Sequence, residues 1–339
     1  MKKYRHIILL LSAAFIIAAR WNEHIGEWYA VTIYPYLSSA ISFASSWISV
    51  SLEEILVVAA VILMIIVGIR GIRHRNPKAI LHEIEIVVWI VIWFYMGWGM
   101  NYYRENIYIR GGIERQKYNE EVFIKFIQDY ADSLNSSYMN LPETVEYADI
   151  EADIKERFSQ VPEYFGLCEP LEWQRPKTLI FNRLYSAVGV AGYIGPFFSE
   201  IQLNADLLPG QVPFCYAHEL SHLLGVSNED EANFWAYQIC RRSDIPEIRY
   251  SGYYSLLPYV LSNASRVLDP GQYKEYMLSV RPEIRQMLAE QQKHWNNLYS
   301  KTLGNIQHKM YDAMLKGNKI SSGTKNYTQV IDLIIATEY

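Results

Sequence analysis

The chain has 339 residues, of which 50% are hydrophobic and 14% aromatic, and its formal net charge is −5 at pH 7. This length allows one large domain or two smaller ones. The acidic balance argues against nucleic acid as a partner, because binding to phosphates requires a basic face. The three cysteines, Cys168, Cys215 and Cys240, show no C-x-x-C spacing, so at most one disulfide and one free thiol are expected among them.

Three nearly uncharged apolar runs lie in the first hundred residues. They cover about residues 5–20, 52–70 and 84–100. A membrane-spanning helix needs about 20 apolar residues, so the first two runs are a little short. Tyr4, Trp21 and Trp47 flank these runs and can anchor their ends at the membrane interface. We therefore predict a membrane region over residues 1–100 with three transmembrane helices.

Charged residues around these runs predict an orientation. Basic residues precede the first run and fill the segment between the second and third runs (Lys2, Lys3, Arg5, Arg70, Arg73, Arg75 and Lys78). The loop between the first and second runs is mainly acidic. The positive-inside rule then places the N-terminus in the cytoplasm and residues 101–339 outside it. We expect a multi-pass protein of the inner (cytoplasmic) membrane, with the lipid bilayer as a partner.

The first run has an alternative interpretation as a cleaved signal peptide. Its basic start is followed by a short apolar core that ends at Ala18 and Ala19, as in a secretory signal. The second and third runs would keep the chain in the membrane in either case.

The region after the membrane is predicted to be mainly helical with a small β-sheet. Apolar residues recur at helical spacing over residues 119–133 and 149–165. Residues 178–181 and 200–204 are strand candidates, and the second either lines a cleft or forms a structural hairpin. A long helical region is expected over 282–315, and a short helix or strand over 330–335.

The central motif is H-E-x-x-H in Ala217-His218-Glu219-Leu220-Ser221-His222. On a helix, His218 and His222 are four residues apart and share one face, so both can bind the same metal ion. Glu219 is then placed to take a proton from water at the metal, as in zinc proteases. The helix is predicted to run from Val212 to Leu224 and to end at Gly225.

A catalytic zinc site needs a third protein ligand beside an open position. A second predicted helix, capped by Ser227 and continuing to Arg241, carries Glu229 and Glu231 in its first turn. The two carboxylates point to different faces, so only one is expected to bind. We prefer Glu229, because Asn233 lies one turn further on the same face and can support a ligand; Glu231 is then a surface, capping or secondary residue. Two imidazoles and a carboxylate suit Zn²⁺.

The pattern Glu-x-x-Ala-Asn after H-E-x-x-H resembles the glutamate-ligand class of zinc peptidases. In that class the first glutamate binds zinc, which implies the same role for Glu229. The interval from His222 to Glu229 is much shorter than in thermolysin, so a turn at Gly225 must bring the ligand back. The metzincin class does not fit, because its third histidine position is Asn228 here.

Several segments resemble the bacterial membrane-protein family called domain of unknown function 3810. They are residues 98–104, 192–200, 250–253 and 315–327, together with the H-E-x-x-H motif and the Glu-Asp-Glu-Ala-Asn that follows it. The resemblance implies three N-terminal transmembrane helices followed by a zincin-like α+β extracytoplasmic domain. It implies no substrate, since none is assigned to the family.

Two functional hypotheses follow. The first is a membrane-anchored zinc peptidase that hydrolyses peptide or protein substrates with Glu219 as general base. In such an enzyme Tyr250 or Tyr253 is a candidate donor to the oxyanion. The second is a non-enzymatic envelope-binding domain with a structural or vestigial metal site. An intact Glu219 argues against the second, because a structural site needs no general base.

Overall fold

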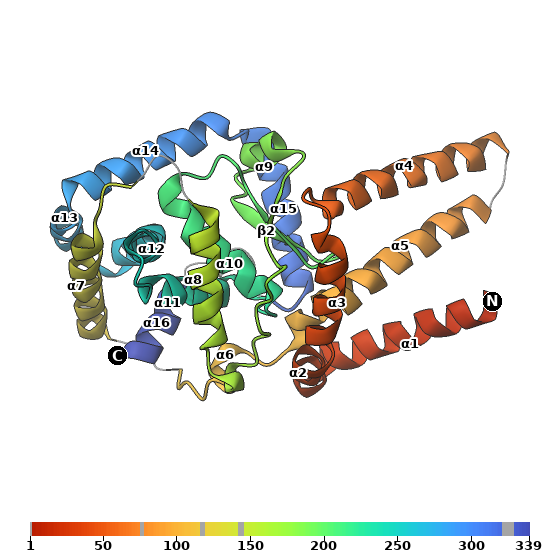
Figure 1. Cartoon of the computed structure of the whole chain (residues 1–339), viewed down its shortest axis with the longest axis horizontal. Helices are drawn as coiled ribbons and strands as arrows, with labels where there is room; N and C mark the ends of the chain where they lie inside the picture. The colour runs from red at the N-terminus through yellow and green to blue at the C-terminus, as the bar shows by residue number, and fades with distance from the viewer. Residues whose placement is uncertain (1, 75–77, 116–118, 142–145, 321–328) are drawn as a thin grey trace.

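The computed structural model describes residues 2–74, 78–115, 119–141, 146–320 and 329–339. Over these residues the chain is mainly helical with one small sheet of three strands, as predicted. Three long helices extend in the same direction from a larger globular part (Figure 1). They are α1 (Lys2–Trp21), α4 (Leu52–Arg73) and α5 (Lys78–Gly97).

These three helices are long and apolar enough to cross a membrane. The qualifying stretches are Tyr4–Trp21, Leu52–Arg73 and Ile80–Gly97, and no residue in the most apolar 18-residue part of the α4 stretch is buried inside the protein. The three predicted apolar helices are therefore confirmed. The third ends at Gly97 rather than at residue 100, because the backbone turns there into the short 3-10 helix η1 (Gly99–Tyr103).

The beginning of α1, the end of α4 and the beginning of α5 lie at the same end of the molecule, away from the globular part (Figure 1). Arg70 and Arg73 occupy the last turn of α4 at this end. Arg70 and Arg73 are thus on the side where α1 begins, as the positive-inside rule requires of two cytoplasmic segments. Of the basic residues in the prediction, Arg75 and the side chains of Lys2, Lys3 and Lys78 lie outside the described residues.

The predicted loop between the first two apolar helices is instead a pair of helices, α2 (Glu23–Thr32) and α3 (Tyr34–Ser46). The side chain of Asn22 accepts a hydrogen bond from His24 N and begins α2. Proline at the start of α3 suits a helix N-terminus, where no donor is needed. Tyr34 is fully buried and donates its hydroxyl to Leu223 O over 2.8 Å, which ties this pair to the globular part.

The sheet has the order β1-β3-β2. Its strands are β1 (Pro176–Thr178), β2 (Gly192–Gly195) and β3 (Glu200–Leu203), with β3 parallel to β1 and antiparallel to β2. The prediction for 200–204 matches β3, but its role as the strand that lines a cleft is wrong. Both sides of β3 are already paired with other strands. The edge strand beside the helix that carries the H-E-x-x-H motif (the motif helix) is therefore β2.

The first predicted strand lies two residues too late in the chain. The backbone N–H groups of Ile180 and Phe181 donate to the carboxylate of Glu54, in the first turn of α4, at 2.6 and 3.0 Å. These donors are therefore not available to a strand. The segment before α4 adds instead to the outer side of β1, where Ser51 N donates to Thr178 O.

The remaining helices surround the sheet and the motif helix. They are α6 (Ile107–Arg110), α7 (Glu120–Ser137), α8 (Tyr147–Ser159), η2 (Glu163–Phe165), α9 (Asn182–Val188), η3 (Pro209–Gln211), α12 (Pro246–Val267), α13 (Pro270–Ser279), α14 (Pro282–Leu298), α15 (Lys301–Gly317) and α16 (Val330–Glu338). The single helical region predicted for 282–315 is two helices, because Ser300 N donates to Ala187 O between them. Helix α8 stops six residues before its predicted end at 165, ahead of Pro162 and a 3-10 turn.

Candidate metal centre

The candidate site lies on two adjacent helices, α10 (Val212–Leu223) and α11 (Glu229–Arg241). Gly225 in the connection has φ = +101°, a backbone conformation that favours glycine because it has no β-carbon. In this turn Gly225 N donates to His222 O and Val226 N donates to Ser221 O, each at 3.1 Å. The chain thereby reverses, and the first residue of α11 comes back to the histidines of α10.

The structure brings the side chains of His218, His222 and Glu229 together. The Nε2 atoms of the two histidines are 3.1 Å apart. Glu229 Oε2 is 3.2 Å from Nε2 of His218 and 3.5 Å from Nε2 of His222. A tetrahedral zinc with bonds of about 2.0–2.1 Å has its ligand atoms about 3.3 Å apart. The three atoms therefore form a triangle of the size that one zinc ion requires.

Each histidine is oriented through its other ring nitrogen. His218 Nδ1 lies 3.0 Å from Asn233 Oδ1, and His222 Nδ1 lies 2.8 Å from Val226 O. Because an amide or backbone carbonyl oxygen can only accept, Nδ1 is the donor in each of these hydrogen bonds, and Nε2 is the nitrogen of each ring that faces the other candidate ligands. Asn233 thus orients His218, in the supporting position that the sequence predicted for it.

The carboxylate of Glu229 is oriented by Tyr311 on α15, whose hydroxyl donates to Oε1. This hydrogen bond leaves Oε2 facing the two imidazoles. Tyr311 was missed by the sequence analysis, because it lies 82 residues further along the chain and is one of 27 tyrosines. No local pattern marks it.

Replacing Tyr311 by phenylalanine is expected to lower zinc affinity by about 10- to 100-fold, the usual effect of losing a partner behind a ligand. Competition against a chelator of known affinity measures this. Tyr95→Phe is the matched control, because the Tyr95 hydroxyl donates to Asn318 Oδ1 beyond the end of the same helix and does not contact Glu229. Equal zinc affinity in the two variants would show that Tyr311 does not position the carboxylate.

The site is mostly buried: Glu219, His222 and Glu229 are between 5% and 7% exposed, and the side chain of His218 is 12% exposed. Burial raises the pKa of Glu219. Burial also acts to raise the pKa of Glu229, but the adjacent imidazoles outweigh it and hold that pKa well below its usual range. Glu229 is therefore ionised where it faces the two histidines.

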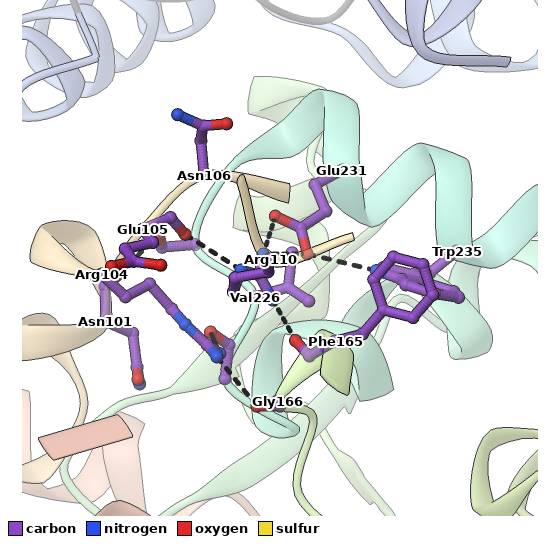
Figure 2. Close-up of polar contacts among 12 residues, drawn as sticks. Asn101, Arg104, Glu105, Asn106, Arg110, Phe165, Gly166, Val226, Glu231 and Trp235 are labelled. Carbon is purple, nitrogen blue, oxygen red and sulfur yellow. Dashed lines mark hydrogen bonds and ion pairs between the residues drawn. The ribbon is translucent and has the colours of Figure 1, made fainter. Parts of the chain in front are cut away.

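Glu231 lies elsewhere, although it is only two residues from Glu229. It is 2% exposed, and both of its oxygens accept from Arg110 Nη2, at 2.5 and 2.6 Å (Figure 2). Trp235 Nε1 donates to the same carboxylate. Of the three roles that the sequence left open for Glu231, the surface position is therefore wrong: its oxygens belong to a buried ion pair and are not directed toward the histidines.

Residues just after α5 hold the turn between the two helices of the site. Arg104 donates to Gly225 O at 3.0 Å and to Gly166 O at 2.9 Å, and it pairs with Glu27. Figure 2 shows Arg104 near Arg110, with Val226 of this turn close by. Ser227 donates to Asn101 O and so does not cap α11, whose N-cap is Asn228. The predicted Ser227 cap is wrong because that hydroxyl serves a tertiary contact.

The two tyrosines suggested as oxyanion donors pack in the helical core. The Tyr250 hydroxyl contacts Met287 Sδ, and the Tyr253 ring packs on Tyr130 and Tyr237. Two other tyrosines, Tyr102 and Tyr259, are near the cluster. Burial raises the pKa of both hydroxyls, and the charge of Glu229 raises it further, to about 12 for Tyr259.

The three cysteines are free, so the disulfide that the sequence allowed is not formed.

The fold and the cluster together define a helical protein with three candidate membrane-spanning helices and a buried group of possible metal ligands. The family model described as "Protein of unknown function (DUF3810)" matches residues 29–335, and the chain belongs to this family. The match extends from α2 to α16 and includes α4 and α5. No curated protein and no solved structure matches the chain.

Proposed function

We propose that this protein is a membrane-anchored, zinc-dependent peptidase with a zincin-like domain. The observation that carries the proposal is the triangle of His218, His222 and Glu229, in which the atoms that face each other are 3.1–3.5 Å apart. The remaining polar atom of each side chain has a partner of its own. A site organised in this way suits a bound metal ion better than a chance meeting of side chains.

Glu219 is the proposed general base. When bound, zinc supplies a Lewis acid that allows water to act as a nucleophile near neutral pH. The Glu219 carboxylate takes a proton from the attacking water and passes it to the leaving amine of the peptide. Burial raises the pKa of Glu219, which suits a group that must both accept and release a proton at neutral pH.

The edge strand β2 provides a place for an extended substrate. A β-carbon at Gly192 would lie 2.9 Å from Glu219 Oε1, so glycine is needed where β2 passes the general base. A peptide can add to an edge strand through main-chain hydrogen bonds. This arrangement would bring a peptide bond next to Glu219.

The alternative, a structural metal site in a binding domain, is less well supported. Structural zinc sites are usually closed by four protein ligands. Within the described part of the chain, the group of histidine, cysteine and acidic residues that can hold an ion has three members. The open fourth position favours a catalytic site.

We further propose that the chain lies in the cytoplasmic membrane with its N-terminus in the cytoplasm and the metal site on the other side. The charge distribution supports this orientation, because Arg70 and Arg73 end α4 on the side where the N-terminus lies (Figure 1). The apolar surface of α4 is unburied, and lipid would cover it.

Removing zinc tests the proposal. The purified full-length protein in detergent is expected to hydrolyse an unfolded protein such as casein, to lose this activity with a chelator and to regain it with zinc. Removing the metal should also lower the melting temperature, because a ligand present at 1,000 times its Kd stabilises the folded state by about 4 kcal/mol. Hydrolysis that persists in a protein shown to be free of metal would contradict the proposal.

A further inference from the structure

We propose that the substrate of this site is a polypeptide anchored in the membrane and cut within a few residues of the bilayer surface. The inference rests on the proposed peptidase function and adds a substrate class to it. It comes from how closely the metal ligands and the edge strand are attached to the ends of α4 and α5.

The first attachment is at the histidines. Trp98 directly follows α5, and its Nε1 donates to His222 O over 2.8 Å. The centres of the Trp98 and His222 rings are 6.3 Å apart. One aromatic side chain therefore separates a candidate metal ligand from the end of a helix proposed to span the membrane.

The second attachment is through β2, which connects the general base to the start of α4. At one end, Gly192 lies against Glu219, with 2.9 Å between its β-carbon position and Oε1. At the other end, the β-carbon position of Gly195 is 3.0 Å from Oε2 of Glu53, the second residue of α4. At about 3.3 Å per residue, the three steps between these glycines cover about 10 Å.

The loop after β2 also contacts the end of α5. Trp93 Nε1 donates to Phe197 O at 3.0 Å, and a β-carbon on Gly97 would lie 2.9 Å from Pro196 O. Phe197 N donates in turn to Glu53 Oε2 at 3.2 Å. The loop is thus held between α4 and α5, at the ends of these helices that adjoin the globular part.

A buried ion pair fixes the sheet to α4. Lys177 on β1 and Glu200 on β3 are 2.5 Å apart, and both side chains are nearly or fully buried. The other oxygen of Glu200 accepts from Leu52 N at 3.0 Å, at the first residue of α4. The distance between the site and α4 is therefore set by direct contacts, not by a flexible linker.

The start of α4 is also where the bilayer begins. Helix α4 has 22 residues, or about 33 Å at 1.5 Å per residue, which is enough to cross a hydrocarbon core of about 30 Å. Glu53 and Glu54 in its first turn are buried against the globular part, so the exposed apolar surface of α4 begins just after them, at Ile55, which is 46% exposed. The backbone N–H groups of Ile180 and Phe181 donate hydrogen bonds to Glu54. Their side chains are 47% and 45% exposed and extend the apolar surface from α4 onto the globular part.

A site so close to the proposed bilayer surface favours substrates that are anchored in the membrane. A chain that leaves the bilayer in an extended form covers about 10 Å in three residues, so it reaches Glu219 without first extending into the solvent. Anchoring both partners in one membrane also raises their effective concentration, to roughly the millimolar range for short tethers. A soluble peptide has neither advantage.

The test uses the full-length protein with zinc in vesicles of phosphatidylethanolamine and phosphatidylglycerol. The probe is a spanning helix of about 20 residues, fused at either end to a randomised segment of about 12 residues that extends to about 40 Å. The comparison is the same randomised segment without the helix. Mass spectrometry locates the cuts, and Glu219→Gln provides the background.

We expect the anchored probe to be cut about three to six residues from the helix, and the soluble segment to be cut at least about 10-fold more slowly. Equal rates for the two probes, or cuts spread evenly along the segment, would overturn the inference and leave the peptidase function standing. If the wild type cuts neither probe and does not cut casein, the proposed function itself is contradicted.

Discussion

Replacing Glu229 by glutamine is expected to abolish zinc binding, whereas the same change at Glu231 is expected to preserve it. Both substitutions remove one buried carboxylate from the first turn of α11. Glu229 Oε2 faces the two imidazoles, while both oxygens of Glu231 accept from Arg110. The loss at Glu229 should exceed the roughly 10- to 100-fold effect of losing an outer partner, because a direct ligand is removed.

The measurement is the zinc content of purified full-length protein, with His222→Ala as a second variant that lacks a ligand. The wild type and Glu231→Gln should hold one zinc per chain, and the other two variants should hold none. Circular dichroism checks that each variant is folded. Zinc retained in Glu229→Gln but lost from folded Glu231→Gln would move the third ligand to Glu231.

Glu231→Gln is itself expected to lower the stability of the folded protein. Arg110 is 3% exposed at its side chain, and the substitution leaves its charge buried without an ionic partner. Breaking a buried ion pair in this way typically lowers the free energy of unfolding by about 3–5 kcal/mol. The control should therefore keep its zinc while melting at a lower temperature, which separates the structural role of Glu231 from the metal-binding role of Glu229.

Replacing Glu219 by glutamine is expected to keep zinc and to remove hydrolysis. Glutamine has nearly the same shape as glutamate, but its amide cannot take a proton from water. Loss of a general base costs about 10²- to 10⁴-fold in rate. The metal ligands are untouched, because Glu219 is not in the group formed by His218, His222 and Glu229.

The decisive comparison is zinc content against rate of casein hydrolysis in the same protein sample. One zinc per chain with a rate at least about 100-fold below the wild type is the expected result. Ser221→Ala on the same helix is a suitable control, because the Ser221 hydroxyl donates to the backbone oxygen of His218 one turn earlier and to no other partner among the described residues. A Glu219→Gln variant that hydrolyses casein at the wild-type rate would exclude Glu219 as the base.

Two parts of the structure were predictable because they depend on short intervals in the sequence. Helical geometry alone places residues four apart on one face, so the pairing of His218 and His222 required no knowledge of the rest of the chain. Gly225 marks the turn that returns Glu229 to them. The long apolar runs similarly predict α1, α4 and α5, because a helix of that length and composition is recognised without its neighbours.

The tertiary structure alone decided which side chains surround the site. Tyr311 reaches Glu229 from 82 residues away, and Arg110 pairs with Glu231 across 121 residues. Ser227 bonds Asn101 instead of capping α11. No local pattern encodes such contacts, because each depends on where a distant segment packs. Whether 192–195 or 200–203 forms the edge strand was likewise decided by pairing, since β3 already has a neighbour on each side and β2 has one.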